Sequence, residues 1–550
     1  VEQQNYFVAP GGPAPTFRIN AYGIAPNNRR FQVMINGTMV VDNAMNFFTP
    51  SVIDIPLPVN LIGRTIDTVR IINNSAVAAD RMAAYKYEIT YPRLFNFGGS
   101  SLFEFELPAS TVGNYIEIVN FNAGNEAPIL YELNEGKRYV ADNAEVGKLK
   151  FALPAGGNRR FILMNATATS VQSVSNLTRK NFVDYAVANK QGDFLIVTHS
   201  SLNASSKGDA IQQYANYRSS VDGGNYKVGV YDIDELVDQF AYGIKKHPLS
   251  IKNFIAYART AFTTSAPKFI LLMGKGVTYD QYRINEIRPS AERMNLVPTF
   301  GNPGSDNILS SSDYDPTPET PIGRLSVTTG DEILAYLDKV KQHDQALKST
   351  NQTIADKAWM KNVAHVIGGG DPYLQGLING YMNTNKSILM DSAFGAKIYT
   401  FEKITPAGNE LVNSGLLGNL FREGLSLITY FGHSSASSME YNLDDPSIYS
   451  NDGKYPLFIA NGCNAGNFFA YDTLRLTGAR RAITENYILT PNKGSIGFLA
   501  STHLGIVNYL NNYTNNFYNK ISRENYASPI GVMQTNVLRD IANPTGTIDF

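Results

Sequence analysis

The sequence predicts an α/β region in two parts, preceded by an all-β region at the N-terminus. Up to about residue 185, apolar and polar residues alternate in short stretches, which is typical of half-buried strands. From residue 186 onward, short apolar runs alternate with stretches of helical periodicity, which is typical of a parallel sheet flanked by helices. At 550 residues, the chain has room for three domains, which we expect over residues 1–185, 186–355 and 356–550.

The N-terminal region is predicted to form an antiparallel sandwich or a barrel-like domain. Tyrosine and isoleucine alternate with charged or polar residues over residues 85–91, so one row of side chains should point inward. Residues 115–119 and 161–164 are further strand candidates, and clusters of turn residues at 10–13 and 154–158 separate such stretches. Several strands joined by tight turns indicate antiparallel pairing.

The α/β region is predicted to begin with a buried strand at residues 194–198. An apolar helical face over residues 233–244 follows, and Ser250 can cap a second helix. A helix is expected around residues 333–340, and the polar stretch 341–356 is a candidate boundary between two α/β parts. The remaining predicted strands cover residues 227–231, 269–273, 363–367, 396–400, 425–431, 457–460 and 495–500.

Composition excludes two classes of protein. Lys and Arg number 47 against 48 Asp and Glu, a formal net charge of −1, whereas a nucleic-acid binder normally carries a basic excess. No apolar run approaches the roughly 18 residues of a membrane span. Since the chain starts at Val1 without a recognisable leader, we expect a mature or trimmed segment.

Two predicted strand ends carry residue types suited to nucleophilic catalysis. The strand at residues 425–431 runs into Gly432 and His433, and the strand at 457–460 runs into Gly462 and Cys463, the single cysteine of the chain. Ligands of open parallel sheets bind beyond the carboxyl ends of the strands. The two residues are 30 positions apart in the chain, which is long enough for a crossover between adjacent parallel strands.

The chemistry of thiols and imidazoles explains such a pair. A neighbouring imidazole raises the thiolate fraction of a cysteine and then protonates the leaving amine. Flanking glycines let backbone amides approach a substrate carbonyl and bind the oxyanion. From the pattern alone, a structural cysteine and a structural histidine remain an equally good interpretation of Cys463 and His433.

Three segments resemble the gingipain family of cysteine peptidases. Residues 424–434 read GLSLITYFGHS and resemble the histidine segment, and residues 456–468 read PLFIANGCNAGNF and resemble the nucleophile segment. Residues 494–502, GSIGFLAST, are similar to the strand whose end lines the specificity pocket. Residues 269–274 and 321–325 also look like family landmarks, and the likeness runs from about Phe194 to Asn536.

The resemblance implies a caspase-like fold in two α/β subdomains and a dyad of Cys463 and His433. It implies oxyanion binding by the backbone amides of Cys463 and Ser434, although glycine is usual in the family where this chain has Ser434. Asp371 is the candidate third carboxylate that orients the histidine, and an acidic N-cap before a helix is an equally good interpretation of it. Candidate substrate-pocket residues are Thr502, His503 and Val507.

The activity implied is peptide-bond hydrolysis by a cysteine endopeptidase through a thioester acyl-enzyme. Two alternatives stay open: the cell-surface sortase of the type IX secretion system, a proteolytic transpeptidase, and a catalytically silent surface-binding homologue. Family membership implies a protein or peptide substrate, contact with other secretion-system components, and a secreted or outer-membrane surface location in a bacterium. It also implies a last core segment beyond Phe550.

No organic cofactor is implied, and calcium is possible as a structural ion. Asp306, Asp313 and Asp315 lie in one stretch, but their spacing differs from an EF-hand loop, and a solvated acidic loop is the favoured interpretation. Lys275 lies between two glycines without the spacing of a phosphate-binding loop. His365 lies within an apolar strand and is predicted to belong to the core.

Overall fold

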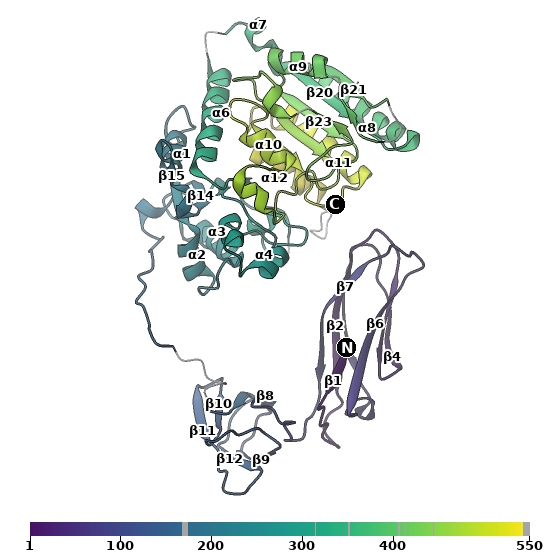
Figure 1. Cartoon of the computed structure of the whole chain (residues 1–550), viewed down its shortest axis with the longest axis vertical. Coiled ribbons are helices and arrows are strands. Elements are labelled where there is room, and N and C mark those ends of the chain that lie inside the picture. The colour runs from purple at the N-terminus through teal and green to yellow at the C-terminus, as the bar shows by residue number, and fades with distance from the viewer. Residues whose placement is uncertain are drawn as a thin grey trace. The chain divides into compact units, whose positions relative to one another are not determined.

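A computed structural model describes residues 1–167, 174–313, 315–349, 352–404, 408–412, 414–443 and 445–542. Phe550, beyond which the resemblance implies a last core segment, lies outside the described residues. The chain divides into two compact units, Val1–Arg179 and Lys180–Phe550 (Figure 1). Each unit has its own hydrophobic cores.

The first unit is built from β-strands, and all pairs between its named strands are antiparallel. It contains two separate cores, one among the first seven strands and one among the next six. The strands are β1 (Glu2–Gln4), β2 (Thr16–Gly23), β3 (Arg30–Ile35), β4 (Thr38–Ala44), β5 (Pro50–Pro56), β6 (Ile66–Asn74), β7 (Met82–Thr90), β8 (Leu102–Leu107), β9 (Asn114–Val119), β10 (Ile129–Glu132), β11 (Lys137–Val140), β12 (Lys148–Leu153) and β13 (Arg159–Met164).

The second unit begins with a parallel four-stranded sheet in the order β17-β14-β18-β19. Successive residues of β14 face opposite cores: Leu195 and Val197 pack with α2 and α3, and Ile196 packs with α1 and α6. The apolar residues of this strand are thereby buried on both of its faces. The elements are β14 (Phe194–Thr198), α1 (Ala210–Ser219), β17 (Val228–Asp232), α2 (Ile233–Phe240), α3 (Leu249–Ala261), β18 (Phe269–Met273), β19 (Ile322–Leu325) and α6 (Gly330–Lys348).

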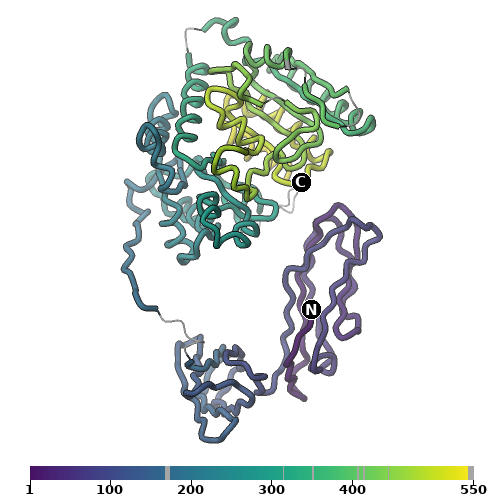
Figure 2. Tube along the Cα trace, viewed as in Figure 1, coloured from purple at the N-terminus to yellow at the C-terminus, as the bar shows by residue number. Residues whose placement is uncertain are grey.

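A second parallel sheet of five strands comes next, in the order β21-β20-β23-β25-β26. Figure 2 traces the chain from the first sheet through α6 into this second half. Helices α9 and α10 pack on one face of the sheet, and α8, α11 and α12 pack on the other. The elements are β20 (Asn362–Ile367), α8 (Pro372–Met390), β21 (Lys397–Glu402), α9 (Ser414–Glu423), β23 (Leu427–Phe431), β25 (Leu457–Asn461), α10 (Ile483–Leu489), β26 (Gly497–Ala500), α11 (Val507–Asn519) and α12 (Ile530–Ile541).

The predicted order of an all-β region and a two-part α/β region with parallel sheets is confirmed. One local prediction is wrong, and one expected helix is longer than predicted. Helix α6 extends to Lys348, into the polar stretch 341–356, because its apolar stripe of Ile333, Leu334 and Leu337 anchors the whole helix. Ser250 lies inside α3 instead of capping it, and its hydroxyl donates to the carbonyl of His247. Among the described helices, none is long and apolar enough to cross a membrane.

Candidate functional site

The ends of β23 and β25 place His433 and Cys463 at equivalent positions on one edge of the second sheet. These strands are parallel neighbours, and Phe431 is paired with Asn461. The amide of Gly432 then donates to the carbonyl of Asn461 over 3.1 Å, so the pairing continues past the last strand residues. His433 and Cys463 each lie two residues beyond the final pair, which is the edge where ligands of parallel sheets bind.

Cys463 is partly buried in a turn that the loop after β26 covers. The Gly505 amide donates to the Cys463 sulfur over 3.4 Å. The amide of Asn464 donates to the carbonyl of His503 over 2.6 Å, and Asn464 has a φ of 57°, a left-handed conformation that asparagine tolerates better than most residues. The loop 501–506 therefore lies directly against the cysteine turn.

His433 is exposed, and its backbone is held firmly. Its carbonyl accepts hydrogen bonds from the hydroxyl of Tyr430 over 2.5 Å and from the amide of Glu440 over 2.9 Å. One edge of the imidazole lies against Gly370, since a Cβ added there would be 3.1 Å from both Cδ2 and Nε2 of His433. Among the described residues the ring makes no hydrogen bond or ion pair, so both nitrogens are available.

Ser434, the departure from the family glycine, directs its hydroxyl to the backbone of the cysteine segment. Its hydroxyl donates to the carbonyl of Cys463 over 2.8 Å and ties the two strand ends together. Gly462 leaves room for this contact, because a Cβ there would lie 2.2 Å from the Ser434 hydroxyl. The hydrogen bonds of the described residues include none donated by the amides of Ser434 or Cys463, so both are free to donate.

Asp371 begins helix α8 as its N-cap. One carboxylate oxygen accepts from the amides of Tyr373 and Leu374, each over 2.9 Å. These contacts support the interpretation of Asp371 as a helix cap. Among the interactions of the described residues, none joins the Asp371 carboxylate to the His433 ring.

Glu440 is a carboxylate beside His433 that the sequence did not reveal. One oxygen accepts from the buried ammonium of Lys403 over 2.6 Å. That same oxygen would lie 3.5 Å from a Cβ on Gly370. The other oxygen is buried and has no hydrogen-bond partner among the described residues. In the sequence, Glu440 stands out only as a charged residue seven positions after the histidine, behind a serine-rich segment.

The three candidate pocket residues come after β26. His503 is exposed and contributes its carbonyl to the turn of Cys463, and Thr502 is half-buried in the same loop. Val507 begins α11 and packs against a cluster that includes Ile367 and Phe431. Thr502 and His503 therefore lie beside the cysteine turn, whereas Val507 packs against apolar residues behind the histidine strand.

The predicted solvated acidic loop holds for Asp313 and Asp315, which are exposed, but not for Asp306. Asp306 forms a two-pronged ion pair with Arg324, with distances of 2.7 and 2.8 Å, and the Asp306 side chain is only 12% exposed. Asp313 pairs with Lys252 over 3.0 Å, and Asp315 accepts from the amide of Thr317. In the described part of the chain, no group of three or more His, Cys, Asp or Glu side chains is arranged to hold a metal.

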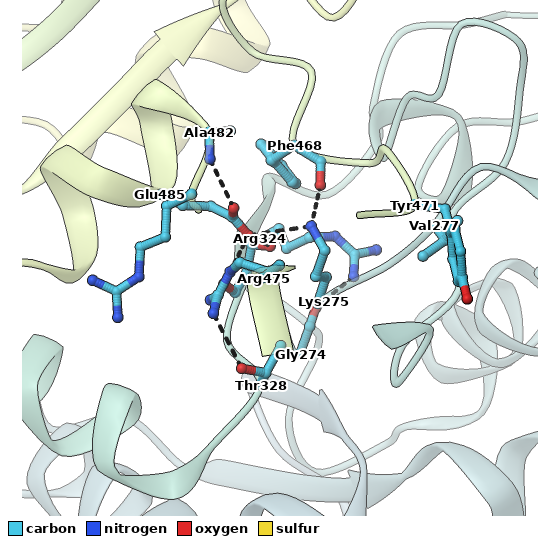
Figure 3. A network of polar contacts seen from close by, with 12 residues as sticks. Gly274, Lys275, Val277, Arg324, Thr328, Phe468, Tyr471, Arg475, Ala482 and Glu485 are labelled. Carbon is cyan, nitrogen blue, oxygen red and sulfur yellow. Dashed lines mark hydrogen bonds and ion pairs between the residues drawn. The ribbon is translucent and has the colours of Figure 1, made fainter. Parts of the chain in front are cut away.

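Lys275 belongs to a buried ionic network that joins the two halves of the second unit (Figure 3). Its ammonium donates to the carbonyl of Phe468, five residues after the cysteine, over 2.5 Å and to Glu485 over 3.3 Å. Glu485 also accepts from Arg475 over 3.1 Å. Burial lowers the pKa of Lys275. Burial would raise the pKa of Glu485, but the charges of Lys275 and Arg475 outweigh it and lower that pKa.

His365 is a core residue, as predicted. It is 1% exposed, and its Nε2 contacts the hydroxyl of Tyr518 over 3.1 Å. Burial lowers the pKa of His365 to about 3, so the ring is neutral and structural at neutral pH.

Comparisons with known proteins give one family and several structures. The profile of Peptidase family C25 matches residues 187–548, and no curated protein matches the chain. The chain is similar to the Arg-specific cysteine proteinase gingipain R, with 14% identity, a TM-score of 0.47 and coverage of 65% of this chain and 74% of that one. It is also similar to the complex of the Porphyromonas gingivalis RgpB pro- and mature domains, with 14% identity, a TM-score of 0.47 and coverage of 64% and 76%. For dimeric latent PorU from Porphyromonas gingivalis the identity is 13%, the TM-score 0.40 and the coverage 70% and 40%.

Proposed function

The chain belongs to peptidase family C25, and we propose that it is a cysteine endopeptidase with Cys463 as nucleophile and His433 as the proton-transfer group. The observation that carries the proposal is the convergence of the two strand ends. Gly432 bonds to Asn461 and Ser434 bonds to Cys463, so the backbone of the histidine segment is fastened to that of the cysteine segment.

The proposed reaction uses groups already in place. The thiolate of Cys463 attacks the substrate carbonyl, while the amides of Cys463 and Ser434 donate to the developing oxyanion. His433, having taken the thiol proton, gives it to the leaving nitrogen, and a thioester forms. Water then attacks the thioester, and His433 accepts and returns the proton. The reaction needs no organic cofactor.

The Ser434 contact supports an active enzyme over a silent homologue. A serine whose hydroxyl is bonded to the Cys463 carbonyl is held away from the space where a substrate carbonyl would lie. Replacing Ser434 by glycine should then leave kcat/KM within about threefold of wild type, since the amide is kept and one hydrogen bond is lost. A rise of tenfold or more would mean instead that the serine obstructs the site.

The direct test is chemical labelling of the thiol together with two substitutions. A panel of acyloxymethyl ketone peptides with basic and neutral side chains should label Cys463 under reducing conditions. The variants Cys463→Ala and His433→Ala should lose cleavage of a denatured protein substrate while melting at the wild-type temperature. Retained cleavage by Cys463→Ala, or failure of every probe to label, would sink the assignment.

Transpeptidation is the second candidate, because an all-β unit of residues 1–179 precedes the α/β unit. The two functions share the acyl-enzyme and differ in what resolves it: water in a peptidase, an amine in a sortase acting at the cell surface. Adding a primary amine acceptor during turnover separates them. Mass spectrometry would find amide-linked product in the second case and only free carboxylate in the first. In either case we propose a location outside the cell or on a bacterial outer membrane.

A further inference from the structure

Glu440 lies directly across a short hairpin from His433. The amide of Glu440 donates to the carbonyl of His433 over 2.9 Å, and Ser434 forms an antiparallel bridge with Met439. Both side chains lie near Gly370: a Cβ on that glycine would be 3.1 Å from the Nε2 of His433 and 3.5 Å from an oxygen of Glu440. The ring nitrogen and that oxygen are therefore at most 6.6 Å apart, the sum of the two distances.

The Glu440 carboxylate has an unused acceptor. Lys403 holds one oxygen over 2.6 Å, and its own side chain is fully buried while that of Glu440 is 13% exposed. The second oxygen is buried without a partner among the described residues. A buried carboxylate oxygen with no donor is costly and needs an explanation. A donor that forms its bond only during the reaction, such as the Nε2–H of an imidazole, supplies one.

Asp371 is engaged elsewhere. Its carboxylate binds two amides at the start of α8, and the residue is exposed. We infer that Glu440, instead of Asp371, is the residue that positions the imidazole of His433 in the reaction. The inference rests on the proposed function, and it makes Glu440 a positioning residue, since it acts through His433 and does not touch the substrate.

The arrangement assigns separate tasks to the two ring nitrogens. The edge bearing Nε2 lies against Gly370, near which a Glu440 oxygen also lies, and Nδ1 lies on the opposite edge. With Nε2–H donated to Glu440, Nδ1 is left with a lone pair that accepts the proton of the Cys463 thiol. Nδ1 later gives this proton to the leaving amine, and Glu440 stays ionised throughout, paired with Lys403. No bond to Glu440 other than a hydrogen bond forms or breaks.

The charged and titratable groups around the ring come from four segments. Glu440 lies on the hairpin, Lys403 comes directly after β21, Asp371 begins α8, and Cys463 lies just beyond β25. Removing one charge at a time separates their effects on the imidazole. Glu402, an exposed carboxylate at the end of β21 beside Lys403, is the matched control for a change of charge near the site.

The test uses the full chain in a Cys463→Ala background, so that it does not depend on catalysis. ¹H–¹⁵N NMR spectra of the histidine rings should show His433 as the Nε2–H tautomer, and Glu440→Gln should lower the ratio of Nε2–H to Nδ1–H tautomers about threefold, because a neutral amide accepts a weaker hydrogen bond than a carboxylate. Asp371→Asn and Glu402→Gln should leave that ratio unchanged. An unchanged ratio in Glu440→Gln, or a larger change in Asp371→Asn, would overturn the inference.

Kinetics with the native cysteine give the second readout. Glu440→Gln should lower kcat at least about tenfold with KM unchanged, as positioning residues behind a catalytic group commonly do. Glu440→Asp, which keeps the charge beside Lys403 if the Gln variant folds poorly, should lower kcat as well, because the carboxylate is withdrawn by one methylene. Equal kcat in Glu440→Asp and wild type contradicts a positioning role. If Cys463→Ala still cleaves, the proposed function fails, whereas the tautomer of the His433 ring still reports on Glu440.

Discussion

Replacing Glu485 by glutamine should destabilise the Lys180–Phe550 unit by about 3–5 kcal/mol. The carboxylate is buried, and it is the anion between two buried cations, Lys275 and Arg475, at 3.3 and 3.1 Å. Glutamine has the same shape but no charge, so both cations would be left in a low-dielectric interior with less compensation. Breaking a buried ion pair from one side costs about 3–5 kcal/mol in other proteins.

The expected change in melting temperature depends on the size of the unit. A unit of residues 180–550 has an unfolding entropy of about 0.8 kcal/mol per kelvin near its midpoint. The loss therefore corresponds to a fall of about 4–6 °C. In the wild type, the Ala482 amide donates to the Glu485 carboxylate over 3.1 Å. A glutamine whose oxygen faces Lys275 and Arg475 would turn its N–H₂ toward that amide, so this hydrogen bond would be lost as well.

Thermal unfolding followed by the fluorescence of Trp359, the single tryptophan of the chain, measures this change in the second unit. The matched control is Glu286→Gln, which breaks an exposed ion pair with Arg283 and should change stability by less than about 0.5 kcal/mol. If Glu485→Gln melts no lower than Glu286→Gln, the network of Figure 3 does not hold the two halves together and the reasoning is refuted.

Two further predictions concern other buried contacts. Gly370→Ala should lower kcat/KM by about tenfold or more, because its Cβ would crowd the His433 ring at 3.1 Å and small misplacements of a catalytic group are costly. The control is Gly376→Ala, where a Cβ meets nothing within 4 Å. Equal activities of the two variants would contradict the position of the ring. Burial lowers the pKa of Lys339 to about 7, so between about pH 7 and 10 the unfolded chain binds the extra proton and stability rises with pH. Urea unfolding should show that the free energy of unfolding of the wild type rises, relative to that of Lys339→Met, by up to about 1.4 kcal/mol per pH unit across that window. If the free energies of both proteins change equally with pH, the lowered pKa of Lys339 is disproved.

Sequence reasoning worked best where one local pattern has one structural solution. The strands β14 and β23 are buried on both faces, and burial on two faces favours a nearly continuous apolar run, interrupted in β23 only by Thr429. The end of α6 was harder to predict than its presence, because a polar surface stretch is compatible with either a loop or the outer part of a helix. The apolar stripe of Ile333, Leu334 and Leu337 that anchors α6 lies about three turns before the end of the helix at Lys348.

The site shows the same division. The strand-end positions of His433 and Cys463 could be predicted, because the end of an apolar run and the polar residues after it are adjacent in the sequence. The neighbours of the His433 ring could not, because Gly370 lies 63 residues earlier and Lys403, which holds Glu440, lies 30 residues earlier. Asp371 was the plausible choice of carboxylate from its position after β20. Only the fold shows that its oxygen caps α8.

The sequence by itself determined the all-β and α/β regions and the two strand ends that carry His433 and Cys463, because each is written in contiguous residues. The tertiary structure alone decided which carboxylate lies beside His433, where the hydroxyl of Ser434 is directed and why Lys275 is buried. Those contacts join residues tens to hundreds of positions apart, such as Lys275 and Glu485, which are separated by 210 positions. Hydrogen bonds and ion pairs form within a few ångströms in space, and local sequence patterns carry no information about such distances.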